Sequence, residues 1–244
     1  MSLFALPTGV KAEEERDVVS SASGPLATNV YPGTIEMIYL DKSDKGALNY
    51  NIIFKTKDGK TVRETIHYSN RAGDLTYMCK KDNVPKPLPG YSQLSAMIEA
   101  ITGMALTDPD QETETKSIKL MDWGLRKEVP VEKVVFMNTI NVKCEAAIYL
   151  NSEEKTTKES GYKDGTGEFR EVNRFMKFLD EDGLTTVERK AGKSEAKHKA
   201  QWLDKNEGQI KIVKAKNPGT KAAAATAGAP VLGGAAPAAS GMFS

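Results

Sequence analysis

Two histidines and two cysteines are the side chains of this sequence best suited to catalysis or metal binding: His67, Cys79, Cys144 and His198. A structural zinc site normally recruits at least one local ligand pair such as C-x₂-C or H-x₃-H, and none of the four residues belongs to one. A Cys79–His67 dyad would also need an orienting third group and an oxyanion motif, which the sequence does not supply. Phosphate-binding glycine motifs are absent as well. We therefore predict no metal, no cofactor and no enzymatic activity.

A different chemistry is indicated by residues 63–91, where cations and aromatic rings are interleaved. Phosphates attract Lys and Arg, and unpaired bases stack on flat rings at roughly 1–3 kcal/mol each. Arginine and lysine are assigned to phosphates here, and tyrosine to stacking; Trp123 is a weaker candidate. The predicted DNA-binding residues are Arg63, Tyr68, Asn70, Arg71, Tyr77, Lys80, Lys81, Lys86, Tyr91 and Trp123. Charged strand faces and half-buried tyrosines that only pack would produce a similar pattern.

Three strands in meander order are predicted to position these residues, over 33–42, 47–56 and 61–68. Alternation places Ile35, Met37 and Tyr39 on one face of the first strand. In the second strand Tyr50 falls with core residues, which makes it a poor stacking residue. In the third strand, Val62, Ile66 and Tyr68 oppose Arg63, Thr65 and His67. The Asp58-Gly59 pair is a strong hairpin signal because it supplies the positive φ angles of a tight turn.

The remaining chain predicts further strands around one clear helix. The helix covers 92–104, capped by Ser92 and ended by Gly103. Its apolar stripe carries no cation, so it is a poor candidate for a DNA major groove. An irregular proline-rich segment is expected over 84–91, and strands over 115–125 and 132–153. A turn is expected over 162–168, and the segment 169–182 is ambiguous between strand and helix. A helix interrupted by Gly192 is expected over 184–208.

These elements predict a mainly β fold, an OB-like five-stranded barrel with an inserted helix, extra strands and a C-terminal helix. The predicted organisation is a flexible arm over 1–29, the binding domain over 30–207, and a disordered basic, then Ala/Gly/Pro-rich tail over 208–244. Lys and Arg number 34 against 33 acidic residues, a net charge of +1, which leaves charged patches open. No run of 18 apolar residues occurs, and two cysteines cannot form a disulfide framework. A cytoplasmic setting without membrane contact is expected.

Four segments of the chain together resemble the single-stranded DNA-binding proteins of tailed bacteriophages that have Ala/Gly-rich tails. They are "RETIHYSNRAGDLTYMCKK", "KPLPGYSQLSAMIEAITGMAL", "KSIKLMDWGLRKEVPVEKVVFM" and the segment from Thr166 to Asn173. The resemblance covers about residues 33–208 and consists of structural landmarks rather than catalytic signatures. One departure is the tail, which has Phe243 near its end but no acidic residue after Glu207.

The resemblance implies an OB-like barrel that coats single-stranded DNA during phage replication, recombination and repair, in the host cytoplasm. Replication or transcription proteins are the partners expected at the C-terminal tail, although the missing acids put the usual mode of recruitment in doubt. Self-association stays open, as does the choice between DNA and RNA. The alternative function is an adaptor for the replication or transcription machinery, with only minor DNA affinity.

Overall fold

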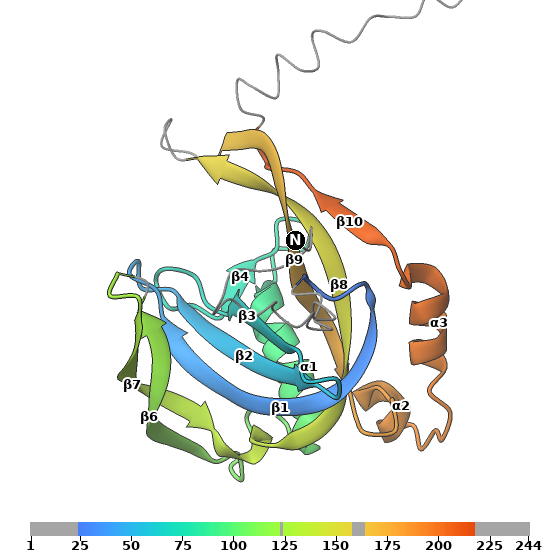
Figure 1. Cartoon of the computed structure of the whole chain (residues 1–244). Coiled ribbons are helices and arrows are strands. Elements are labelled where there is room, and N and C mark those ends of the chain that lie inside the picture. The colour runs from blue at the N-terminus through green and yellow to red at the C-terminus, as the bar shows by residue number, and fades with distance from the viewer. Residues whose placement is uncertain (1–23, 123, 158–163, 218–244) are drawn as a thin grey trace, which may run out of the picture.

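The computed structural model describes residues 24–122, 124–157 and 164–217, and within them the chain is mainly β (Figure 1). The strands are β1 (Asn29–Lys42), β2 (Leu48–Thr56), β3 (Thr61–His67), β4 (Thr76–Met78), β5 (Pro85–Pro87), β6 (Thr113–Asp122), β7 (Lys127–Phe136), β8 (Val142–Thr157), β9 (Asp164–Leu179) and β10 (Ile210–Val213). The helices are α1 (Pro89–Thr102), η1 (Met137–Thr139), α2 (Thr186–Lys190) and α3 (Lys197–Asn206). None of these helices is long and apolar enough to cross a lipid bilayer.

The large sheet has eight strands and is organised around β1. β1 pairs with β2 along most of its length, and β2 pairs with β3, which confirms the predicted meander. The other edge of β1 pairs first with β8 and then with β7, all antiparallel. β6 extends the sheet from β7, and β8 pairs with β9. The two short strands β4 and β5 form a separate sheet.

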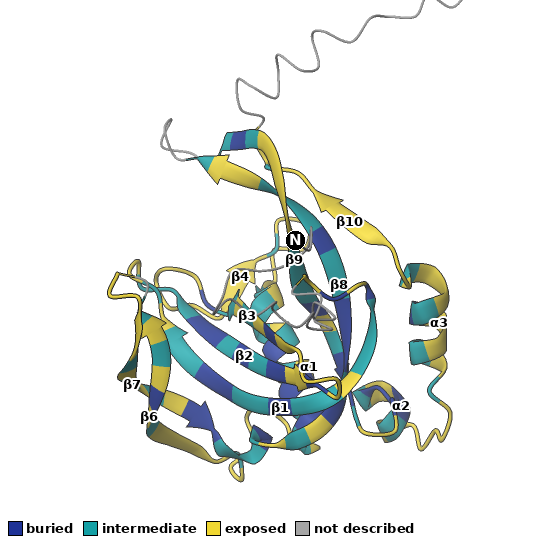
Figure 2. Cartoon of the chain, in the orientation of Figure 1, coloured by how far each residue is buried: buried dark blue, intermediate teal, exposed yellow. Residues whose placement is uncertain are grey.

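The faces of β2 and β3 follow the predicted alternation. Tyr50, Ile52 and Phe54 of β2 are buried in the main core, with Val62 of β3 (Figure 2). The prediction for β1 was wrong: Ile35 is in the main core, but Met37 and Tyr39 are on the opposite face. A bulge between Ile35 and Met37 is the reason, because one extra residue reverses the alternation beyond it.

α1 begins earlier than the sequence predicted. Pro89 occupies its first turn, where the missing N–H costs nothing, and Leu88 rather than Ser92 precedes the helix, with no side-chain cap. The segment expected to be irregular therefore contains β5 and the start of α1. The predicted end is confirmed, since Gly103 has a left-handed φ of 78° and its N–H bonds to Glu99 O.

The C-terminal part adds one strand that the sequence did not predict. The ambiguous segment is strand β9, which begins at Asp164 and so also replaces most of the expected turn. The interrupted helix is confirmed as α2 and α3, separated around Gly192. β10 then pairs in parallel with β8, within the region expected to be a disordered tail. The ordered sheet therefore extends beyond the expected boundary at 207; residues 1–23 and 218–244 lie outside the described part.

The sheet does not close through main-chain pairing between β3 and β9 in the described chain. These two strands nevertheless lie next to each other, and side chains connect them. Glu64 of β3 accepts a hydrogen bond from the Phe175 N–H of β9 at 2.6 Å. Arg174 donates a hydrogen bond from Nη1 to Glu64 at 3.4 Å. It also forms a bidentate contact with Glu153 of β8, in which Nε and Nη2 each donate to one carboxylate oxygen at 2.7 Å. We call this cluster the β3–β9 seam.

The pKa of Glu64 leads to a stability prediction for the seam. Burial raises this pKa above the ordinary value, although the Phe175 N–H and the Arg174 guanidinium oppose the rise. A carboxyl whose pKa is raised in the folded state stabilises the fold at low pH and loses that contribution as pH rises through its folded pKa. Glu64→Gln keeps an acceptor for Phe175 and removes the titration.

Between about pH 4 and about pH 7, wild type loses the contribution of Glu64 and Glu64→Gln does not. The free energy of unfolding of Glu64→Gln, measured with urea, should therefore rise relative to that of wild type as pH increases. Glu64→Asp, which keeps a titrating carboxyl, is the control. A difference that is constant with pH, or that moves in favour of wild type, would contradict this account of Glu64.

Candidate nucleic-acid interface

The outer face of β2 and β3 presents polar and cationic side chains. On β3, Arg63, Thr65 and His67 are exposed, as predicted, and so is Thr61. Their partners on β2 are Ile53, Asn51 and Asn49, so side chains of the two strands stand opposite each other in pairs. The Thr65 hydroxyl donates to Asn51 Oδ1 at 2.5 Å, and the Asn51 amide donates to Asn49 Oδ1 at 3.0 Å. This surface, which we call the β2–β3 face, combines hydrogen-bonding groups with a guanidinium.

The β6–β7 hairpin covers the neighbouring part of the same sheet. Ile118 of β6 and Val135 of β7 are buried against Tyr39 of β1, and Ile53 of β2 packs on this small core. Burial and Asp41 raise the pKa of Tyr39, whereas the charge of Arg63 lowers it, so Arg63 lies near this hydroxyl. The hairpin therefore forms a wall along one side of the β2–β3 face.

Arg71 lies beyond the end of β3, in a turn shaped by Asn70. Asn70 Oδ1 accepts hydrogen bonds from the N–H groups of Ala72 and Asp74, each at 2.9 Å, and its amide donates to Asp74 at 2.8 Å. This turn lies against the β1–β2 turn, since the Arg71 carbonyl would be 3.0 Å from a Cβ on Gly46. Arg71 is exposed. The Asn70 side chain, which the sequence interpretation assigned to DNA, instead uses its amide group to hold this turn.

Two predicted stacking residues are half-buried in the fold. Tyr68 packs on the main core, with its ring centroid 6.3 Å from that of the fully buried Tyr50. Tyr91 lies in the first turn of α1 and is half-buried. Trp123 lies outside the described residues. No fully exposed aromatic ring therefore accompanies Arg63 on the β2–β3 face among the described residues.

The other predicted residues belong to the β4–β5 hairpin. Tyr77 is 46% exposed on β4, and Lys80 and Lys81 are exposed in the connecting turn. Lys86 on β5 forms an ion pair with Asp82 at 2.6 Å, so its charge is already matched. Within the described chain, no hydrogen bond or ion pair joins this hairpin to the β2–β3 face. The structure thus separates the predicted site into two groups, one on the sheet and one on the hairpin.

The histidines and cysteines do not converge. His67 is exposed on β3, His198 is in α3, Cys79 is in the β4–β5 hairpin and Cys144 is in the main core. Burial raises the pKa of the Cys144 thiol to about 12, with smaller contributions from Glu145 and Glu181. A thiol that stays protonated is a weak nucleophile. The described residues contain no group of three or more His, Cys, Asp or Glu placed to hold a metal ion.

Comparisons with known proteins add no family. No protein-family model matches the chain, and a search of curated proteins found no match.

Proposed function

We propose that this protein binds single-stranded DNA without sequence preference, across the β2–β3 face. The observation that carries the proposal is that Arg63 on this face and Arg71 in the turn beyond β3 are both exposed, and neither makes an ion pair with any described residue. Arg63 is two residues from Thr65, which forms a hydrogen-bonding pair with Asn51. Unpaired cations are free to replace counterions on phosphates, and amide and hydroxyl groups can contact phosphate oxygens, which carry no sequence information. The wall formed by the β6–β7 hairpin gives this surface one raised side.

The strand connectivity supports an OB-like reading of the domain. The meander β1–β2–β3 is followed by α1, and β8 then returns to β1 while β9 lies beside β3, an order compatible with a five-stranded barrel. In this reading the β3–β9 seam closes the barrel through side chains, the β6–β7 hairpin is an insertion, and β10 is an addition. OB folds commonly bind oligonucleotides across the strand 2–3 face, which agrees with the location of Arg63.

A single strand is favoured over a duplex because no suitable helix is exposed for the major groove among the described residues. The apolar stripe of α1 is buried, and two lysines of α3 are paired, Lys197 with Glu195 and Lys199 with Glu145. The role in phage replication and recombination rests on the sequence resemblance, as does host cytoplasmic localisation. The hairpin residues Tyr77, Lys80 and Lys81 are proposed as a secondary contact, and Lys86 contributes less because Asp82 neutralises it.

The proposal is tested by fluorescence anisotropy with labelled oligo-dT and a matching duplex at two salt concentrations. We expect preference for the single strand, weakened by salt. Arg63→Ala/Arg71→Ala should reduce the slope of log K against log salt by about 1.4, because each phosphate that is no longer neutralised accounts for about 0.7. Lys193→Ala/Lys205→Ala, which removes two exposed lysines from the α2–α3 region, should bind like wild type. Equal affinity for single strand and duplex, or an unchanged slope in the arginine variant, would argue against the β2–β3 face.

An adaptor function is the second candidate, and β10 favours it. Ile210 and Ile212 are 52% and 66% exposed on a strand whose outer edge is unpaired within the described chain (Figure 2). Such an edge can accept a strand from another protein. In an adaptor, Ile212→Lys would abolish partner capture, while Arg63→Ala/Arg71→Ala would leave it intact.

A further inference from the structure

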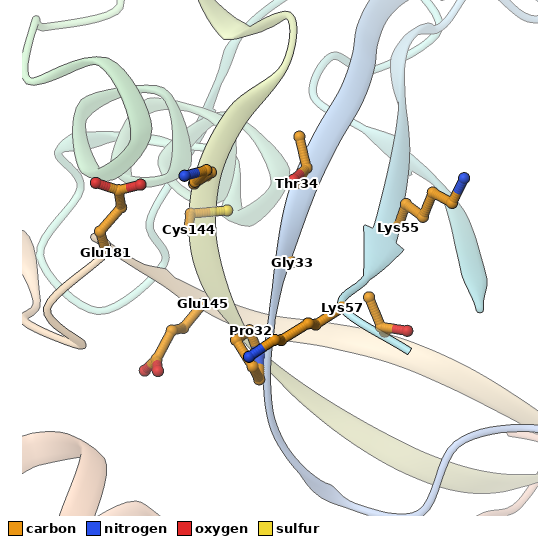
Figure 3. Close-up of a pocket in the computed structure, with 10 residues that line it drawn as sticks. Pro32, Gly33, Thr34, Lys55, Lys57, Cys144, Glu145 and Glu181 are labelled. Atoms are coloured by element: carbon orange, nitrogen blue, oxygen red, sulfur yellow. The ribbon is translucent and has the colours of Figure 1, made fainter. Parts of the chain in front are cut away.

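We infer that the bound strand continues past Arg63, across β2 and β1, into a lysine-lined pocket where β1, β2 and β8 meet. The inference rests on the proposed function and extends it to a second phosphate-binding subsite. The pocket has a volume of about 450 Å³, and the cations that line it are Lys55, Lys57 and Lys143 (Figure 3). The sequence interpretation assigned none of these three to DNA.

The strand register makes this pocket continuous with the β2–β3 face. Lys55 on β2 is paired with Thr61 on β3 and with Thr34 on β1, and Thr34 is paired in turn with Lys143 on β8. Lys55 is therefore a diagonal neighbour of Arg63, at roughly 7–8 Å between Cα atoms. Three strand spacings separate β3 from β8, about 14–15 Å. Lys55 and Lys143 thus lie in one cross-strand row through Thr34, and Arg63 is two residues along β3 from that row.

The lysines of the pocket are available for an anion. Lys55, Lys57 and Lys143 are exposed, and none makes an ion pair with a described residue. Two glutamates also line the pocket, but Glu145 is matched by Lys199, whose Nζ lies 2.6 Å from Oε2. Figure 3 shows Glu145 and Glu181 on one side of β1, with Lys55 and Lys57 coming from the other side. Lys55 and Lys57 therefore come from the side of the pocket nearer Arg63, whereas Lys143 is on β8, the strand that carries Glu145.

The base of the pocket is formed by residues of β1 and β8 where the backbones of β1 and β2 approach closely. A Cβ on Gly33 would lie 2.3 Å from the Lys55 carbonyl oxygen and 2.5 Å from the buried Phe54 ring, so β1 and β2 approach closely here and Gly33 faces the core. Pro32 has no N–H to satisfy, and Cys144 is buried beneath, with its sulfur pointing toward Gly33 and Thr34 (Figure 3). The large side chains that line the pocket are therefore its lysines and glutamates, and Lys57 extends past Pro32 (Figure 3).

The inference predicts that the effect of the pocket lysines depends on DNA length. Lys57→Ala/Lys143→Ala should bind oligo-dT of about 16 nucleotides with a salt slope reduced by about 1.4 and about tenfold weaker affinity at low salt. Oligo-dT of about six nucleotides, which fits on the β2–β3 face alone, should bind within about twofold of wild type. Lys193→Ala/Lys205→Ala is the control with the same loss of charge, and thermal unfolding verifies that each variant is folded.

The outcomes separate the inference from the proposed function. If wild type binds both oligonucleotides and the pocket variant matches it at both lengths, the pocket is not on the path and only the inference fails. An equal loss at both lengths would also overturn it, because the lysines would then belong to the first contact. If wild type binds neither oligonucleotide, the proposed function itself fails.

Discussion

Arg174→Ala is expected to lower the free energy of unfolding by about 2–3 kcal/mol, one of the two largest effects predicted for this protein. Arg174 faces Glu64 and Glu153 at once, so its removal leaves two carboxylates without their cation. The Glu64 side chain is only 9% exposed, which makes its unpaired charge costly; Arg174 itself is 35% exposed, which limits the loss. Urea unfolding at neutral pH measures the change.

Arg170→Ala is the matched control for this prediction. Arg170 is on the same strand and also faces Glu153, but its nearest nitrogen is 3.9 Å from the carboxylate and its side chain is 61% exposed. We expect a change of less than about 0.5 kcal/mol. If the two variants lose similar stability, the seam does not hold β3 against β9. A further test is Arg174→Ala/Glu64→Gln, which should recover part of the loss because one unpaired charge is gone.

Gly90→Ala is expected to destabilise the fold by about 2–4 kcal/mol through overpacking. A Cβ on Gly90 would lie 1.9 Å from the His67 carbonyl oxygen and 2.8 Å from its carbonyl carbon. Both are backbone atoms at the end of β3, so no side-chain rotation relieves the overlap. The first turn of α1 would have to move away from β3, and Leu94 and Ile98, which are buried in the core, would move with it.

Gly24→Ala provides the control, because a Cβ there meets no atom within 4 Å. Thermal or urea unfolding of the two variants should give a large loss for Gly90→Ala and almost none for Gly24→Ala. Alanine also favours helix over glycine, so its propensity acts against the expected result. A neutral or stabilising Gly90→Ala would mean that α1 is not pressed against the end of β3.

Local pattern was sufficient for the parts of the β2–β3 face that depend on neighbours in sequence. Alternation separated Arg63, Thr65 and His67 from Val62 and placed Tyr50 in the core, because successive side chains on a strand point to opposite faces. The Asp58-Gly59 turn and the end of α1 at Gly103 were predictable for the same reason. Each requires only a particular backbone angle at a particular residue.

Tertiary structure decided what depends on distant residues. The bulge at Ile35 and Met37 is set by pairing with two other strands, and β10 became a strand because β8 presents an edge to it. Glu64 and Arg174 are 110 positions apart, and alternation cannot tell which strand edges will meet.

The roles of the predicted site residues were decided in the same way. The hydrogen bonds of Asn70 and the ion pair of Lys86 occupy groups that the sequence interpretation had assigned to DNA. Lys143 joins the cations of β2 and β3 only through the β1–β8 register. Sequence periodicity determined which way each side chain faces along its own strand, whereas the proximity of charges across strands depends on chain pairing that no local pattern encodes.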